Sequence, residues 1–192
     1  MNSTSNIKLD IISYIENNLN KNRLNHTYGV RDTAVKLARI YGEDEEKAEL
    51  AALFHDMAKH FKGENLNYYV KHLGLDSKYL GNSNLAHGKI AAALMKKDFN
   101  VDDEDIIGAV SYHTTGKENM SLLEKIIYIA DAIEPNRDYP GVVELRDLAF
   151  KDLDKAIIMS MENTIKRVDE LGGYLDDDTI KALEYLRRTN DK

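Results

Sequence analysis

Residues 53–59, LFHDMAK, join an apolar stretch to an adjacent histidine and aspartate. Ala48, Ala51 and Ala52 precede His55 at the i, i+3, i+4, i+7 spacing that is typical of the buried face of a helix. His55 is therefore predicted to point into the core at a helix end, where Asp56 beside it can reach the same metal ion. A single buried His-Asp pair is more often structural than metal-binding, so the interpretation needs support from elsewhere in the chain.

Three more histidines and a second aspartate supply this support. His26 stands at the head of one apolar helical stripe, His87 leads another and His113 closes a third. Asp131 lies inside the apolar run 122–133. Burying so many polar groups is costly unless they are paired or bind a metal. Core histidines that each bond a carbonyl are the alternative, but this requires several independent coincidences, so we predict one metal centre built from five helical segments.

Composition limits the possible classes of function. The 192 residues suit one domain, which we place over 1–192 because no linker, repeat or low-complexity tract interrupts it. A net charge of -7 argues against nucleic-acid binding, and the absence of cysteine excludes disulfides and thiolate ligands. No signal peptide is evident at the N-terminus, and no apolar run approaches the roughly 20 residues of a membrane span. We therefore expect a soluble cytoplasmic protein with no membrane partner.

The 3.6-residue period dominates the chain, which predicts an all-α fold, a single helical bundle with the metal site in its core. Asp44 and Ser121 are predicted N-caps, the latter in a capping box with Glu124. His60 and His72 lie among polar neighbours and are interpreted as solvated. The helices are expected at about 7–19, 27–41, 45–56, 65–73, 87–99, 103–113, 122–134, 142–150, 153–171 and 178–188.

The order His26, His55-Asp56, His87, His113, Asp131 resembles the signature of the HD superfamily of metal-dependent phosphohydrolases. The resemblance implies that His26, His55, Asp56 and Asp131 hold one metal, while His87 and His113 allow a second that Asp56 bridges. Nitrogen and carboxylate ligands suit Fe, Mn, Co, Ni or Zn. Two close metals activate a water as hydroxide and stabilise the entering and leaving oxygens at phosphorus. Hydrolysis of a phosphate ester or anhydride, without a covalent nucleophile, is the predicted reaction.

A closer resemblance comes from the segments HTTG (113–116), LEKIIYIAD (123–131), IEPNR (133–137) and PGV (140–142). They closely resemble the bacterial HD-domain symmetrical bis(5'-nucleosyl)-tetraphosphatases, over about residues 26–183. That family implies cleavage of diadenosine tetraphosphate into two ADP, with iron at the site. The expected partner is a small dinucleoside polyphosphate or ADP, and the sequence leaves open whether the chain forms a homodimer. It also implies a core at about 20–150, with C-terminal helices at about 152–190 completing the nucleotide pocket.

The resemblance assigns roles to individual residues. Asp56 and Lys59 are the expected catalytic residues. The ADP phosphates are expected to contact Asp56, Met57, Ala58, Lys59, His87, His113, Thr114 and Arg137. The nucleoside is expected at Gly173, Tyr174, Leu175, Asp176, Asp177 and Asp178, although this stretch is more acidic than the family pattern. The alternatives are an exposed lysine at 59, a plain turn residue at 114 and a solvated arginine at 137. Lys89 lies off the inward stripe and is left out.

Three other functions fit the metal motif. Another HD phosphohydrolase would act on nucleoside triphosphates, alarmones or cyclic dinucleotides, and a di-iron HD relative would activate oxygen. A nucleotide sensor on the same scaffold would bind without catalysis. Only the segment 113–142 favours the symmetrical tetraphosphatase over these.

Overall fold

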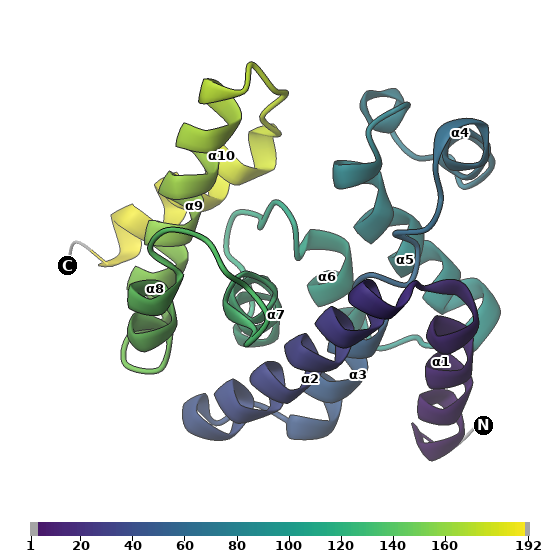
Figure 1. The fold of residues 1–192 in the computed structure, drawn as a ribbon, viewed down its shortest axis with the longest axis horizontal. Helices are drawn as coiled ribbons and strands as arrows, with labels where there is room; N and C mark the ends of the chain where they lie inside the picture. Colours follow the sequence, from purple (N-terminus) through teal and green to yellow (C-terminus); the bar gives the residue numbers. More distant parts are fainter. Residues whose placement is uncertain (1–3, 191–192) are drawn as a thin grey trace.

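The computed structural model describes residues 4–190, which form ten α-helices and one short 3-10 helix without any strand (Figure 1). The predicted all-α class is therefore confirmed for this part of the chain. The elements are α1 (Thr4–Asn18), α2 (Lys21–Tyr41), α3 (Glu45–Phe54), α4 (Gly63–His72), η1 (Ser77–Tyr79), α5 (Ser83–Phe99), α6 (Glu104–Tyr112), α7 (Leu122–Ile133), α8 (Val142–Ala149), α9 (Leu153–Glu170) and α10 (Asp177–Asn190).

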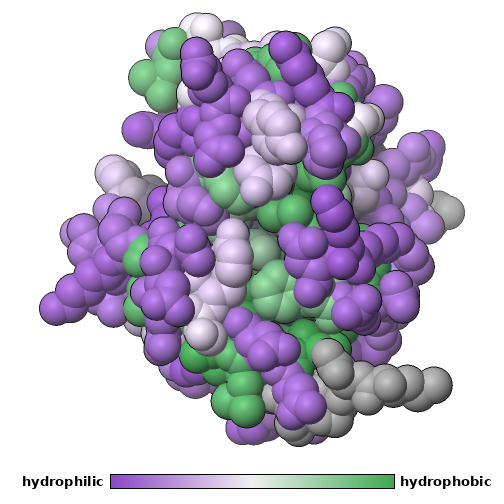
Figure 2. All heavy atoms as spheres, turned by 90° about the vertical axis from the view of Figure 1, so that its right-hand side faces the viewer, coloured by the Kyte–Doolittle hydropathy of each residue, from purple (hydrophilic) through white to green (hydrophobic). Residues whose placement is uncertain are grey.

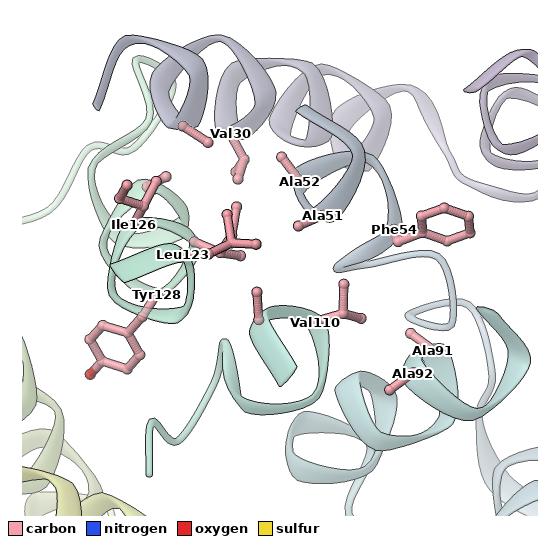
Figure 3. Close-up of a cluster of buried hydrophobic side chains, with 14 of the residues drawn as sticks. Val30, Ala51, Ala52, Phe54, Ala91, Ala92, Val110, Leu123, Ile126 and Tyr128 are labelled. Atoms are coloured by element: carbon pink, nitrogen blue, oxygen red, sulfur yellow. The ribbon is translucent and has the colours of Figure 1, made fainter. Parts of the chain in front are cut away.

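The core lies where α2, α3, α6 and α7 pack against one another. Val30 of α2, Val110 of α6 and Leu123 of α7 point into the same apolar space (Figure 3). The neighbouring positions on α3 are Ala51 and Ala52, both fully buried. Small side chains let helix backbones approach closely, and this brings the histidines of α2 and α3 to one centre. Burying a side chain as large as Val or Leu contributes about 1.5–3 kcal/mol to the stability of the fold.

Side-chain caps determine where the helices that carry the site begin. Asp44 accepts hydrogen bonds from two backbone N–H groups at the start of α3, and Asp103 does the same for α6. Ser121 and Glu124 form the predicted capping box of α7. That helix ends at Ile133, and its C-cap Glu134 stands directly before Pro135, as expected. The caps of α3, α6 and α7 therefore fix the register in which His55, His113 and Asp131 reach the core.

The starts of α5 and α2 differ from the prediction. Helix α5 begins at Ser83, where the Asn82 side chain caps it, so His87 lies within the helix and not at its head. Helix α2 begins at Lys21 and not near residue 27, so His26 lies in its second turn and not at its head. The side chain of Asn20 accepts a hydrogen bond from the backbone N–H of Arg23 at 2.9 Å, which caps this earlier start. Residues 21–25 contain only one apolar side chain, so their helical state left little periodic signal in the sequence.

The C-terminal helices form a separate layer on α7. Helix α9 packs on α7, α8 and α10. In Figure 1, α8, α9 and α10 lie beside α7, on the side away from α1 and α4. One ion pair joins the two sides of the molecule. Lys78 of η1 contacts Asp176, the residue just before α10, with 3.0 Å between Nζ and Oδ2. Segments that are 98 residues apart in sequence are thereby linked.

Across residues 4–190 no helix combines the length and apolar character that a span requires. The face shown in Figure 2 is mostly hydrophilic, with hydrophobic residues gathered near its middle.

The prediction of two solvated histidines is correct for His72 and wrong for His60. His72 is exposed and stacks on Tyr68. His60 is half-buried. The centroid of its ring lies 4.1 Å from that of Phe61 and 6.1 Å from that of Tyr14. Its Nδ1 donates to the backbone oxygen of Met57 at 3.0 Å. The polar neighbours in sequence gave no sign of this packing, because Tyr14 comes from α1.

Burial lowers the pKa of His60 below its usual value, and this predicts a pH effect on stability. The folded state favours the neutral ring, so the contribution of His60 to the free energy of unfolding is fully present above the unfolded pKa of about 6.5. It is lost as the pH falls through the lower folded pKa. We expect urea denaturation to show a smaller loss of stability between pH 7 and pH 5 in His60→Asn than in the wild type. His72→Asn is the matched control and should follow the wild type; equal pH dependence in all three proteins would contradict the prediction.

Candidate metal centre

Four histidines and two aspartates meet in the interior, as the sequence predicted. His26 comes from α2, and His87 from α5. His55 and His113 are the C-cap residues directly after α3 and α6, and Asp56 is the residue after His55. Asp131 comes from the last turns of α7. The four imidazoles and Asp56 are buried, and Asp131 is partly exposed at the rim.

The ligand atoms form two clusters that share one carboxylate. In the first cluster, Nε2 of His26 lies 3.3 Å from Nε2 of His55, and both nitrogens lie 3.5 Å from Oδ2 of Asp56. Oδ1 of Asp131 lies 3.1 Å from Nε2 of His26. In the second cluster, Nε2 of His87 lies 2.9 Å from Nε2 of His113 and 3.1 Å from Oδ1 of Asp56. Asp56 thus contributes one oxygen to each cluster.

The other ring nitrogen of every histidine faces an oxygen acceptor. Nδ1 of His55 is 2.6 Å from the carbonyl oxygen of Ala52, and Nδ1 of His113 is 2.7 Å from that of Val110. The Nδ1 atoms of His87 and His26 similarly face the Ser83 carbonyl and the Glu134 carboxylate. A neutral imidazole that donates from Nδ1 presents a lone pair at Nε2.

These tautomers make the centre suitable for metal ions. Facing lone pairs at 2.9 and 3.3 Å repel each other, and a cation between them replaces this repulsion by two attractive contacts. Histidines that ligate metals usually have their second nitrogen hydrogen-bonded to a carbonyl or carboxylate, as all four have here. The donor set of imidazole nitrogen and carboxylate oxygen fits a divalent transition metal.

Burial and neighbouring charges shift the pKa values of the groups at the centre, in opposite directions for different histidines. Burial alone raises the pKa of Asp56, but the charges and hydrogen bonds of His55 and His87 lower it well below its usual value. Burial opposes the ionisation of Asp131 too, yet His26 and the Arg137 guanidinium lower its pKa strongly. Burial lowers the pKa of His87 and that of His113. Burial opposes a charge on His55, but the charge and hydrogen bond of Asp56 raise its pKa. Ionised carboxylates and neutral imidazoles are the forms that bind metals, so a cation at the first cluster would take the place of the His55 proton.

Comparison with known proteins agrees with this geometry. The model of the HD domain family matches residues 23–136, which include every proposed ligand. The chain belongs to the HD domain family. Such a domain implies a divalent metal, and the two clusters supply its ligands. The predicted resemblance to HD proteins is confirmed.

Several relatives of this HD domain protein are named symmetrical bis(5'-nucleosyl)-tetraphosphatases. The protein from Bacillus subtilis (strain 168) is 43% identical over 157 residues, 81% of this chain and 84% of that one. The protein from Staphylococcus aureus (strain NCTC 8325 / PS 47) is 36% identical over 91% of each chain. A crystal structure from Clostridium acetobutylicum, described as a predicted HD superfamily hydrolase involved in NAD metabolism, has a TM-score of 0.89. It is 50% identical and covers 94% of this chain and 96% of its own.

Three predicted phosphate-binding side chains of the HD domain lie beside the clusters. Nζ of Lys59 is 3.3 Å from Nδ1 and 3.4 Å from Nε2 of His87, and burial lowers the pKa of this lysine. The alternative of an exposed lysine is therefore wrong. Oγ1 of Thr114 is 3.2 Å from Nε2 of His113. Arg137 donates from Nε to the Asp131 carbonyl oxygen at 2.8 Å and pairs with its carboxylate, so it is not simply solvated. Met57 and Ala58, in the turn between Asp56 and Lys59, have buried side chains.

Two residues at the centre, Arg23 and Glu134, were not predicted from the sequence. Nη1 of Arg23 lies 2.7 Å from Oδ2 of Asp56, and Oε1 of Glu134 lies 3.1 Å from Nδ1 of His26. Arg23 comes three residues before His26 in α2, so the two side chains share a helix face. Glu134 comes three residues after Asp131, directly after the end of α7, and continues the face that carries Asp131. That spacing was the available signal, but it is weak because charged residues at i±3 are common on helices.

The predicted nucleoside segment lies at the start of α10. Tyr174 is exposed, while Asp176 is buried and pairs with Lys78. Lys89, which the prediction left out, is half-buried with Nζ 3.3 Å from the centre of the Tyr112 ring. Burial lowers the pKa of Lys89 to about 8, opposed by the nearby charges of Asp178 and Asp176. Tyr112 directly precedes His113, so Lys89 and the aspartates whose charges act on it lie on the side of the second cluster. Lys78 and Lys89 offset the negative charge of this segment.

Proposed function

We propose that this HD-domain hydrolase cleaves diadenosine tetraphosphate at its midpoint and releases two molecules of ADP. The observation that carries the proposal is the pair of ligand clusters that share Asp56. Two adjacent cations are the arrangement suited to in-line displacement at phosphorus. The printed name of the relatives, symmetrical bis(5'-nucleosyl)-tetraphosphatase, supports the substrate and the position of the cut.

Metal ions would occupy both clusters. His26, His55, Asp56 and Asp131 would hold one ion, and Asp56, His87 and His113 the other. We propose iron, which the resemblance to the symmetrical tetraphosphatases implies, with Mn, Co, Ni or Zn as substitutes that suit the same nitrogen and oxygen ligands. When bound, such a pair supplies a water of lowered pKa and neutralises the charge of the phosphates.

The chain's own residues would then bind and orient the phosphates. Lys59 places a half-buried ammonium next to His87, and an ammonium in this low-dielectric setting attracts a phosphate oxygen more strongly than one in water. Thr114 can donate its hydroxyl beside the second cluster, and Arg137 presents a guanidinium at the first. Met57 and Ala58 have buried side chains, so only their backbone can contact the substrate. Asp56 would act as the shared ligand on which both metal positions depend.

The nucleoside would bind near the start of α10, at Gly173, Tyr174, Leu175, Asp176, Asp177 and Asp178. The Lys78–Asp176 ion pair supports this placement because it joins the segment to the helices beside the second cluster. In this proposal the C-terminal helices, about 152–190, complete the pocket of a core at about 20–150. A homodimer and a cytoplasmic location remain predictions.

Product analysis tests the reaction. Metal-loaded protein incubated with diadenosine tetraphosphate should yield ADP as the only nucleotide, two molecules for each substrate consumed. ATP with AMP would overturn the proposal. A higher kcat/KM for nucleoside triphosphates, alarmones or cyclic dinucleotides would favour another HD phosphohydrolase. An unchanged rate without oxygen is expected, whereas a need for oxygen would point to the di-iron oxygenase.

Lys59→Met tests the lysine's role. The change keeps the length of the side chain and removes its charge, so kcat/KM for diadenosine tetraphosphate should fall by roughly a hundredfold, as for the loss of one donor to transition-state charge. Metal content should be unchanged, because Lys59 is not a ligand. Lys62→Met is the matched control, since Lys62 is exposed and bonds Ser83. A loss of less than threefold in the Lys59 variant would contradict the role.

A further inference from the structure

A polar cavity opens beside the first cluster, at the opposite end of the centre from Lys59 and Thr114. Its volume is about 480 Å³, within the usual range of small-molecule sites. It is bordered by His26 and Glu134, and its walls carry Asn20, Asn22, Arg23, Asn25, Asn136 and Arg137. Lys59 and Thr114, by contrast, contact His87 and His113 of the second cluster. The centre therefore has binding groups at both ends.

Two arginines connect this cavity to the metal ligands. Arg23 uses Nη1 on Asp56, and Arg137 uses Nε and Nη2 on Asp131. Within residues 4–190 the remaining guanidinium nitrogens of these two side chains have no hydrogen-bond partner in the protein, and both side chains are about one-third exposed. A guanidinium that holds a carboxylate with one edge can bind a phosphate with another. The cavity mouth thus offers two cationic groups directly next to the metal centre.

The outer wall is made of asparagines. Asn20 caps α2, and the amide of Asn136 donates to Glu134, so these two serve the fold. Asn22 and Asn25 are exposed, and their amides bond no protein group in the described part of the chain. An amide offers a donor and an acceptor side by side, which matches the edge of a nucleobase or the hydroxyls of a ribose. A cluster of amides behind two arginines therefore has the polarity of a nucleotide site.

We infer that this cavity binds the second half of the dinucleotide, a nucleoside 5'-diphosphate, with its phosphates at Arg23 and Arg137 and its nucleoside at Asn22 and Asn25. The inference rests on the proposed function. Cleavage at the midpoint of a tetraphosphate leaves one nucleoside diphosphate on each side of the broken bond. One half is assigned to the second cluster, with Lys59, Thr114 and the start of α10. The other half then needs a site at the first cluster, where this cavity lies.

The test separates the second nucleoside from the rest of the substrate. The double variant Asn22→Ala/Asn25→Ala removes the free amides and favours the helix that carries them, so folding should be unaffected. Its kcat/KM for diadenosine tetraphosphate should fall about tenfold. Its kcat/KM for adenosine 5'-tetraphosphate, which has the same phosphates but a single nucleoside, should change less than twofold. Asn17→Ala/Asn163→Ala alters two exposed helical asparagines elsewhere and should match the wild type on both substrates.

Binding provides a second readout. Calorimetry of the metal-loaded wild type with ADP should give two molecules bound per chain, and Asn25→Trp, which places an indole at the cavity wall, should give one. Two ADP bound to Asn25→Trp, or equal losses on the two substrates in the double variant, would overturn the inference. Failure of the proposed function looks different, because the wild type would then not hydrolyse diadenosine tetraphosphate at all.

Discussion

Replacing Asp56 by asparagine is expected to lower kcat for diadenosine tetraphosphate by at least about a thousandfold, the equivalent of roughly 4 kcal/mol in barrier height. The two oxygens of this carboxylate reach different clusters, Oδ2 towards His26 and His55 and Oδ1 towards His87. An amide keeps the shape but loses the charge, and its nitrogen cannot act as a metal ligand. Both metal positions should therefore weaken at once.

The same variant predicts a measurable metal defect. Elemental analysis of purified Asp56→Asn should find less than one metal ion per chain, whereas the wild type should retain up to two. Asp102→Asn is the matched control, because Asp102 is exposed and belongs to neither ligand cluster. If Asp56→Asn kept more than a tenth of wild-type activity, the shared-carboxylate account would be wrong.

Removal of the metal is expected to abolish hydrolysis and to lower thermal stability strongly. Four buried imidazoles and a buried carboxylate are packed together, and bound cations offset their mutual repulsion. A metal present at a thousand times its dissociation constant stabilises the folded state by about 4 kcal/mol. For a chain of this size each kcal/mol corresponds to about 2–4 °C, so Tm should fall by roughly ten degrees after chelation.

Differential scanning calorimetry before and after dialysis against a chelator checks this expectation. Adding Mn²⁺ back should restore both Tm and activity, while Mg²⁺, which prefers oxygen ligands, should restore neither fully. Asp56→Asn should show a smaller shift on chelation than the wild type. Activity that survives chelation, or an unchanged Tm, would contradict the assignment of the two clusters as a catalytic metal centre.

The buried part of the centre was predictable because helical periodicity reports which residues face the core. His55, His87 and His113 each occupy a position in an apolar stripe, and a polar residue there stands out. The capping box at Ser121 fixed the start of α7 and therefore the approach of Asp131. These signals are local, and local signals can be read from one sequence.

The groups that surround the ligands were not predictable in the same way. Arg23 belongs to a polar stretch whose helical state depends on the Asn20 cap, and it reaches Asp56 across 33 residues of sequence. His60 lies in the turn after α3 and packs near Tyr14 of α1, which comes from a distant part of the sequence. Lys78 and Asp176 meet only because the two sides of the molecule come together. Such contacts depend on tertiary packing, which residue spacing does not encode.

Anomalous X-ray diffraction from crystals of Mn²⁺-loaded protein tests the central claim most directly. The account predicts two peaks in the interior, one among His26, His55, Asp56 and Asp131 and one among Asp56, His87 and His113, with the Asp56 carboxylate between them. No anomalous peak at these side chains, or a single peak that Asp56 does not contact, would contradict it.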